Sequence, residues 1–144
     1  DVERLAFSWP EEFFDYMVFG DVLEHLHDPG TVLRRLRKYL KQGGRIIVSM
    51  PNVKHYSVML PLLCKDEFTY QEEGILVKTH VKLYTGTEIR RLLVDSGFYV
   101  ERMEGITRGE NAQEQRRVTE LLARMNLPDI PSYFYYQYLV RAVK

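Results

Sequence analysis

Residues 13–50 read FFDYMVFGDVLEHLHDPGTVLRRLRKYLKQGGRIIVSM, and this stretch decides the fold class. Phe13 to Phe19 and Arg45 to Met50 are almost continuously apolar and too short for helices, which is typical of strands covered on both faces. Between them, Asp28 is expected to cap a helix over residues 29–41. Strand, capped helix and strand within about 35 residues predict a βαβ unit with parallel strands and a right-handed crossover. The fold class that follows is α/β.

The helix expected over residues 29–41 is amphipathic and basic. Gly43 is predicted to end it in the left-handed conformation. Five cations lie outside its apolar face: Arg34, Arg35, Arg37, Lys38 and Lys41. A nucleic-acid patch is one interpretation, but a solvated helix face is favoured. The whole chain has 20 basic and 20 acidic residues, so it has no overall field to hold a polyanion, and we expect no nucleic-acid partner.

The bulk composition is that of one ordinary domain. The chain has 144 residues, of which 45% are hydrophobic, and no segment approaches the roughly 18 apolar residues of a membrane span. We expect a small-molecule substrate and no membrane partner. Cys64 is the single cysteine and no signal peptide precedes the first apolar run, so we expect a cytoplasmic protein.

Residues 51–84 have no clear periodicity but are rich in aromatic side chains. A connection of this length in a compact domain is often functional, so we predict a lid or an acceptor-site insertion. Four aromatic elements within it could line an acceptor pocket, although ordinary packing is the favoured interpretation: Phe68, Tyr70, Tyr84 and the His55-Tyr56 pair.

The remaining elements follow from capping signals and β propensity. Thr85 and Glu88 form a capping box that starts a helix ending near Gly97, and residues 98–106 are a plausible strand. Asn111 is expected to cap a further helix. The aromatic and β-branched segment 133–143 is predicted to be the closing strand.

In an open α/β sheet, ligands bind beyond the carboxyl ends of the strands, which places GDVLEHLHDPG, residues 20–30, beside a crevice. At this point a resemblance appears. Residues 14–52 resemble the second half of a class I S-adenosylmethionine-dependent methyltransferase, including the "LEH...DP" turn and the "L-K-x-G-G" approach to the next strand. Residues 74–98, GILVKTHVKLYTGTEIRRLLVDSGF, are similar to a "T-H-x-R-F-F-T" segment of its type 11/12/23-like branch, and 137–143, QYLVRAV, to the closing strand.

The resemblance implies a Rossmann-like sheet with strands equivalent to 4-5-7-6, the last one antiparallel, and flanking helices. It implies that Asp1 accepts from the adenine amino group of the cofactor and that Gly20 and Asp21 border the cofactor. The family's glycine-rich loop and ribose-binding acid have no counterpart here. We therefore expect a single domain that is the C-terminal portion of a larger methyltransferase, inactive or nearly so alone. The exposed edge of its first strand is expected to invite pairing with a second copy.

Histidines supply the candidates for proton transfer, since a neutral imidazole titrates near working pH. For His25 and His80, which match family motifs, a catalytic role and a structural hydrogen bond both stay open. For His27 and His55 the structural interpretation is favoured. Asp21, Glu24 and His25 also resemble the E-x-x-E-H pattern by which quinone-biosynthesis O-methyltransferases bind a divalent ion; the alternative is that Glu24 and His25 only order the turn.

These observations predict part of an S-adenosylmethionine-dependent methyltransferase that acts on a small-molecule acceptor. Two rivals remain. A noncatalytic interaction module derived from the same fold would lack the cofactor loop. Half of a nicotinamide-dependent oxidoreductase on a similar sheet would bind a dinucleotide instead, and the aromatic closing strand argues against it.

Overall fold

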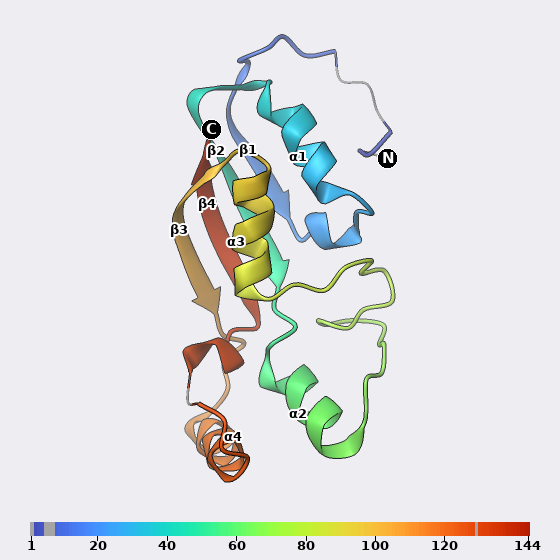
Figure 1. The fold of residues 1–144 in the computed structure, drawn as a ribbon, viewed down its shortest axis with the longest axis vertical. Coiled ribbons are helices and arrows are strands. Elements are labelled where there is room, and N and C mark those ends of the chain that lie inside the picture. Colours follow the sequence, from blue (N-terminus) through green and yellow to red (C-terminus); the bar gives the residue numbers. More distant parts are fainter. Residues whose placement is uncertain (1, 5–7, 129) are drawn as a thin grey trace.

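The computed structural model describes residues 2–4, 8–128 and 130–144. Strand β1 (Phe14–Gly20) and strand β2 (Leu40–Pro51) are parallel, with Gly20 opposite Ser49 in the register. Helix α1 (Pro29–Arg37) joins them and packs on one face of the sheet (Figure 1). The Asp28 carboxylate accepts a hydrogen bond from the Thr31 amide at 2.9 Å, which confirms the predicted cap. The βαβ unit is therefore confirmed.

The sheet has four strands in the order β1-β2-β4-β3. Helix α3 (Gly86–Asp95) leads into β3 (Tyr99–Ile106), and β4 (Gln137–Val143) inserts between β2 and β3, antiparallel to both. This is the predicted 4-5-7-6 arrangement with an antiparallel last strand. Thr85 caps α3 by accepting from the Glu88 amide at 3.4 Å. The predicted fold class is thus confirmed.

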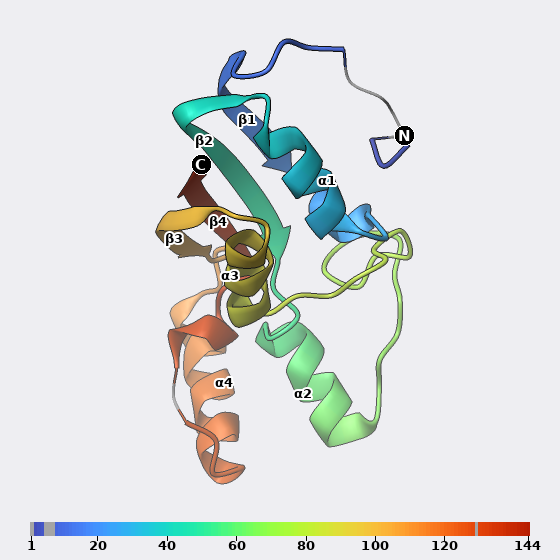
Figure 2. The ribbon, with the colours of Figure 1, turned by 45° about the horizontal axis from the view of Figure 1, so that its top comes forward.

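The main core lies between the sheet and the two helices α1 and α3, which cover the same face (Figures 1 and 2). Leu33 of α1, Leu93 of α3 and Val48 of β2 are fully buried there. On the other face of β1, Tyr16 is 58% exposed and Val18 is 72% exposed. The prediction that this strand is covered on both faces is wrong, because the described helices of the βαβ unit and its neighbour lie on one side only.

Two further helices lie beyond the end of the sheet (Figure 2). Helix α2 (Tyr56–Lys65) follows β2, and helix α4 (Ala112–Arg124) lies between β3 and β4. They share a second apolar cluster, centred on Val118 and Leu122 of α4 and Tyr133. Tyr133 closes a 3-10 turn (Pro131–Tyr133), so the closing strand begins later than predicted, at Gln137.

Helix α2 is an element that sequence periodicity missed. Its segment YSVMLPLLCK carries apolar side chains all round and a proline at position 61 within the helix, so no 3.6-residue stripe stands out. Helix α1 also ends at Arg37, earlier than the predicted residue 41. The Tyr39 carbonyl accepts hydrogen bonds from the amides of residues 13 and 14, so the backbone at Tyr39 already pairs with the segment that leads into β1. Gly43 takes the predicted left-handed conformation, with a φ of +73°, but it lies within β2 and does not end the helix.

The cations of α1, and Lys41 at the start of β2, make contacts within the domain. The Arg34 guanidinium donates to Thr31 Oγ1, Arg37 donates to the Gly97 carbonyl, and Lys41 pairs with Asp15 at 2.8 Å. These contacts favour the interpretation of a solvated, structural face. Among the described residues, no helix has the length and apolar character needed to cross a membrane.

Candidate functional site at the carboxyl end of β1

Gly20 and Asp21 form the turn at the carboxyl end of β1. A Cβ added to Gly20 would meet no atom within 4 Å, so the backbone there is open to an approaching group. Asp21 takes a left-handed φ of 49°. Its amide donates to the Ser49 hydroxyl at 3.1 Å, and that hydroxyl donates to Asp21 Oδ1 at 2.9 Å. Ser49 of β2 therefore fixes the Asp21 carboxylate, a role that no sequence motif indicated.

Glu24 lies in the 3-10 turn Leu23–His25 that follows, and its side chain is fully buried. Neither carboxylate oxygen has a hydrogen-bond partner among the described residues. Burial is the main reason that the pKa of Glu24 rises to about 7, and the nearby Asp21 charge raises it further. A carboxyl group in this state can hold or release a proton near neutral pH.

The segment before α3 folds back onto this turn. The Glu24 carbonyl accepts from the amides of Val81 and Lys82 at 2.9 and 3.1 Å. This docking brings His80 beside Glu24, with 3.9 Å between His80 Nε2 and Glu24 Oε1. His25 completes the cluster, because its ring stands edge-on to that of His80 at a centroid distance of 4.8 Å. The structure thus brings together the two predicted catalytic histidines.

Backbone carbonyls set the tautomers of both imidazoles. His25 Nδ1 lies 2.9 Å from the Thr79 carbonyl, and His80 Nδ1 lies 2.8 Å from the Ile75 carbonyl. A carbonyl only accepts, so each Nδ1 carries the hydrogen and each neutral ring leaves an unprotonated Nε2. Burial lowers the pKa of His80, which keeps that ring neutral. The Nε2 lone pair is then available to take a proton or bind a metal.

Glu24, His25 and His80 form a group whose ligand atoms all lie within 4.8 Å of one another. The buried carboxylate without a partner and the two Nε2 atoms fit a divalent metal chemically. Two imidazoles with one carboxylate suit zinc, manganese or iron better than magnesium. Asp21 does not belong to this group, since its carboxylate is turned to Ser49. The set that the structure assembles therefore has His80 where the sequence pattern placed Asp21.

The other predicted residues lie elsewhere. Asp1 falls outside the described residues. His27 is exposed. His55 is buried and caps α2, accepting from the Ser57 amide, with its Nε2 3.2 Å from Glu110 Oε1. Burial lowers the pKa of His55, and its contacts agree with the structural interpretation.

The aromatic residues proposed for an acceptor pocket do not gather into one group. Tyr84 belongs to the sheet core, whereas Tyr56 packs in the second cluster with Phe134. Phe68 and Tyr70 contact each other edge-on at 5.9 Å and are exposed. Burial raises the pKa of Tyr84 to about 12, so its phenol stays protonated. Ordinary packing accounts for Tyr84 and Tyr56.

An open α/β sheet with a glycine and polar side chains at a strand's carboxyl end defines a Rossmann-like class of protein. The match of residues 2–102 to a methyltransferase domain family shows that this chain belongs to that family. A curated relative, the ubiquinone biosynthesis O-methyltransferase of Aeromonas salmonicida (strain A449), is 27% identical over 104 residues, covering 72% of this chain and 43% of the relative. The matched part of the chain thus spans less than half the length of that relative.

Solved structures support the fold. An S-adenosylmethionine-dependent methyltransferase from Mesorhizobium loti superposes with a TM-score of 0.58 at 20% identity, covering 100% of this chain and 67% of that one. The 1,6-didemethyltoxoflavin-N1-methyltransferase of Burkholderia thailandensis, solved with 1,6-didemethyltoxoflavin and S-adenosylhomocysteine, superposes with a TM-score of 0.56 at 17% identity. That match covers 99% of this chain and 48% of that one.

Proposed function

We propose that this chain supplies one wall of the S-adenosylmethionine site, and the proton-accepting groups, of a methyltransferase that acts on a small-molecule acceptor. The open backbone at Gly20, beside the fixed carboxylate of Asp21, is the observation that carries the proposal. It lies at the end of β1, where ligands of open α/β sheets bind. The portion of the relatives outside this chain is expected to supply the rest of the cofactor site, so the isolated chain should be inactive or nearly so.

Bound S-adenosylmethionine would supply a methyl group on a sulfonium, and its transfer is an in-line displacement that depends mainly on positioning and on exclusion of water. Gly20 lets a ligand approach the backbone, and Asp21 offers an oriented acceptor. When the acceptor is a hydroxyl, its proton must leave, and His80 Nε2 is placed to take it. Glu24, 3.9 Å away and with a pKa of about 7, stabilises the imidazolium that forms. Residues 51–84 deliver His80 and serve as the lid over the acceptor.

The test is a titration of the chain with S-adenosylhomocysteine, followed by backbone amide shifts. Saturable shifts at residues 20–25, absent with ATP as the control ligand, are expected. A Gly20→Val variant fills the open space and should lose them. No shifts at millimolar ligand would overturn cofactor binding by this chain. If a chain extended to the length of the relatives also fails to bind, the noncatalytic interaction module becomes the better account.

A divalent metal at Glu24, His25 and His80 is a second candidate, favoured by the buried carboxylate without a partner and by the two adjacent imidazoles. Such an ion would lower the pKa of a bound hydroxyl and so replace the histidine as the activating group. Calorimetric titration with Zn²⁺ or Mn²⁺ should show one site that His80→Ala removes and Asp21→Asn retains. If Asp21→Asn loses metal binding as His80→Ala does, Asp21 is also a ligand, which would favour the set predicted from the sequence: Asp21, Glu24 and His25.

A further inference from the structure

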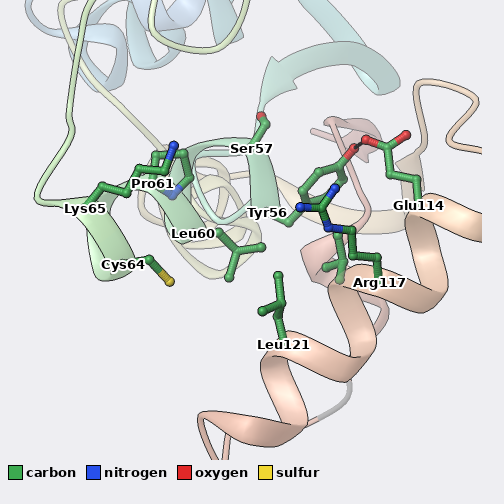
Figure 3. A pocket seen from close by; sticks show the side chains of 10 residues that line it. Tyr56, Ser57, Leu60, Pro61, Cys64, Lys65, Glu114, Arg117 and Leu121 are labelled. Atoms are coloured by element: carbon green, nitrogen blue, oxygen red, sulfur yellow. Dashed lines mark hydrogen bonds between the residues drawn. The ribbon is translucent and has the colours of Figure 1, made fainter.

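A cavity separate from the carboxyl end of β1 lies between helices α2 and α4. It has a volume of about 400 Å³, which falls within the range of small-molecule sites. Leu60 and Pro61 of α2 form one wall, and Val118 and Leu121 of α4 form the other. Figure 3 shows Leu60 and Leu121 directed toward each other across the space. The middle of the cavity is therefore apolar.

Polar side chains stand at one end of this apolar space. The Tyr56 hydroxyl donates to Glu114 Oε1 at 2.6 Å and joins the two helices (Figure 3). The pKa of Tyr56 is raised by burial and by this carboxylate, so the phenol keeps its proton. Glu114 is thus already engaged with a donor. The Glu114 carboxylate therefore has a hydrogen-bond donor without a cationic ligand in the cavity.

Arg117 is the cation left for a ligand at this cavity. Lys65 and Arg117 both line it, together with the carboxylate of Glu114, but Lys65 lies 3.9 Å from the Glu67 carboxylate. No described acid lies within ion-pair distance of Arg117, whereas its neighbour Arg116 is paired with Glu120 at 3.1 Å. Arg117 lies on the same side of the cavity as Tyr56 and Glu114 (Figure 3). A guanidinium without a partner at the edge of an apolar space is suited to an anion carried on an apolar body.

We propose that the cavity between α2 and α4 binds one small amphipathic molecule with an apolar body and a single anionic head group, such as a medium-chain carboxylate. The body fills the space between Leu60 and Leu121, where it gains hydrophobic free energy. The head group pairs with Arg117. The site is built from helices outside the sheet, so the proposal holds whether or not the chain binds a methyl donor.

The test compares three eight-carbon ligands: octanoate, 1-octanol and octyltrimethylammonium. Methyl resonances of the wall residues report binding at the site, and the single cysteine, Cys64, which lines the cavity, gives a second readout through its rate of alkylation by N-ethylmaleimide. Octanoate is expected to bind roughly fivefold or more tightly than 1-octanol, and the cation least tightly. Bound octanoate should slow Cys64 alkylation. Equal affinity for all three ligands, or no saturable binding, would overturn the proposal.

Matched variants locate the charge and the walls. Arg117→Met should remove the preference for octanoate over 1-octanol, whereas Arg116→Met, on the same helix but outside the cavity, should keep it. Leu121→Asp should weaken octanoate at least tenfold, because it places a like charge in the apolar wall. Leu62→Asp on the exposed side of α2 is its control. Equal effects of Arg117→Met and Arg116→Met would show that binding is nonspecific and would overturn the proposal.

Discussion

Oε1 of Glu24 and Nε2 of His80 lie 3.9 Å apart inside the domain, although one residue follows β1 and the other precedes α3. Backbone hydrogen bonds from Val81 and Lys82 to the Glu24 carbonyl hold them together. The carboxyl group has no hydrogen-bond donor among the described residues, so its burial dominates its titration. The relationship makes the stability of the domain depend on pH.

Replacing Glu24 by glutamine should change that dependence. The pKa of Glu24 is about 7 in the folded chain, against 4.5 for a glutamate in water, so the folded state binds the proton more tightly. Its contribution to stability is present below pH 4.5 and is lost as the pH rises through 7. From pH 5 to pH 8, Glu24→Gln should therefore gain about 2 to 3 kcal/mol in free energy of unfolding relative to the parent.

Urea unfolding at several pH values in a chelating buffer measures this difference. His80 contributes in the opposite sense, because its lowered pKa adds stability that is lost as the pH falls below 6.5. That contribution is common to both proteins and largely cancels. Glu11→Gln, at a side chain that is 72% exposed, is the control and should leave the profile unchanged. Parallel profiles for Glu24→Gln and the parent would contradict the assignment.

Two glycines should respond differently to alanine. A Cβ on Gly105 of β3 would lie 2.0 to 2.4 Å from ring atoms of Tyr135, a clash that requires the ring to move. Gly105→Ala is expected to lower the free energy of unfolding by about 1 to 3 kcal/mol. Gly20→Ala meets no atom and should change stability by less than about 0.5 kcal/mol, while weakening any ligand that approaches the backbone. Chemical denaturation of both variants checks the contrast; similar losses would refute it.

The buried side-chain amide of Asn52 is expected to stabilise the domain, because it joins the end of β2 to the segment that precedes β4. Its Nδ2 donates to the carbonyls of Ser132 and Tyr135 at 2.9 and 2.7 Å. Asn52→Ala leaves both carbonyls without this donor and is expected to cost about 2 to 3 kcal/mol of unfolding free energy. Thermal or urea unfolding gives the value. A loss of less than about 0.5 kcal/mol, which is typical of substitutions at the surface, would mean that water replaces the amide as the donor to both carbonyls.

The Asn111 side chain caps α4 by accepting from the Glu114 amide at 2.9 Å. Asn111→Ala should cost about 1 kcal/mol, and Asn111→Asp should retain most of the stability because aspartate also caps helices. Because Glu114 also binds the Tyr56 hydroxyl, the alanine variant should loosen the contact between α2 and α4. Hydrogen exchange of the first turn of α4 measures this effect, and unchanged protection in Asn111→Ala would contradict it.

The open face and free edge of β1 predict self-association of the isolated chain. Tyr16 and Val18 are exposed there, and an unpaired strand edge is a template for another chain. We expect a dimer in sedimentation experiments at high concentration, weakened at least tenfold by Val18→Lys. Tyr99→Lys, at the opposite edge of the sheet and equally exposed, is the control. A chain that stays monomeric at all concentrations would refute this expectation.

Local sequence signals predicted most of the helices and strands of this fold. The apolar runs on either side of Asp28, together with the caps at Thr85 and Asn111, indicated three helices and the βαβ unit, because capping depends on residues three positions apart. Helix α2 was missed for the converse reason. Its proline and its uniform apolarity remove the periodic signal, and its stability comes from packing against α4.

By itself, then, the sequence determined the α/β class and, through its family resemblance, the strand order, and it singled out Gly20, His25 and His80 as candidate site residues. Only the tertiary structure decided that Glu24 is buried beside His80, that Ser49 holds Asp21, and that α2 and α4 line a cavity. The physical reason is that these relationships join segments far apart in the chain. Nonlocal backbone hydrogen bonds and burial place them, and neither leaves a periodic pattern in the sequence.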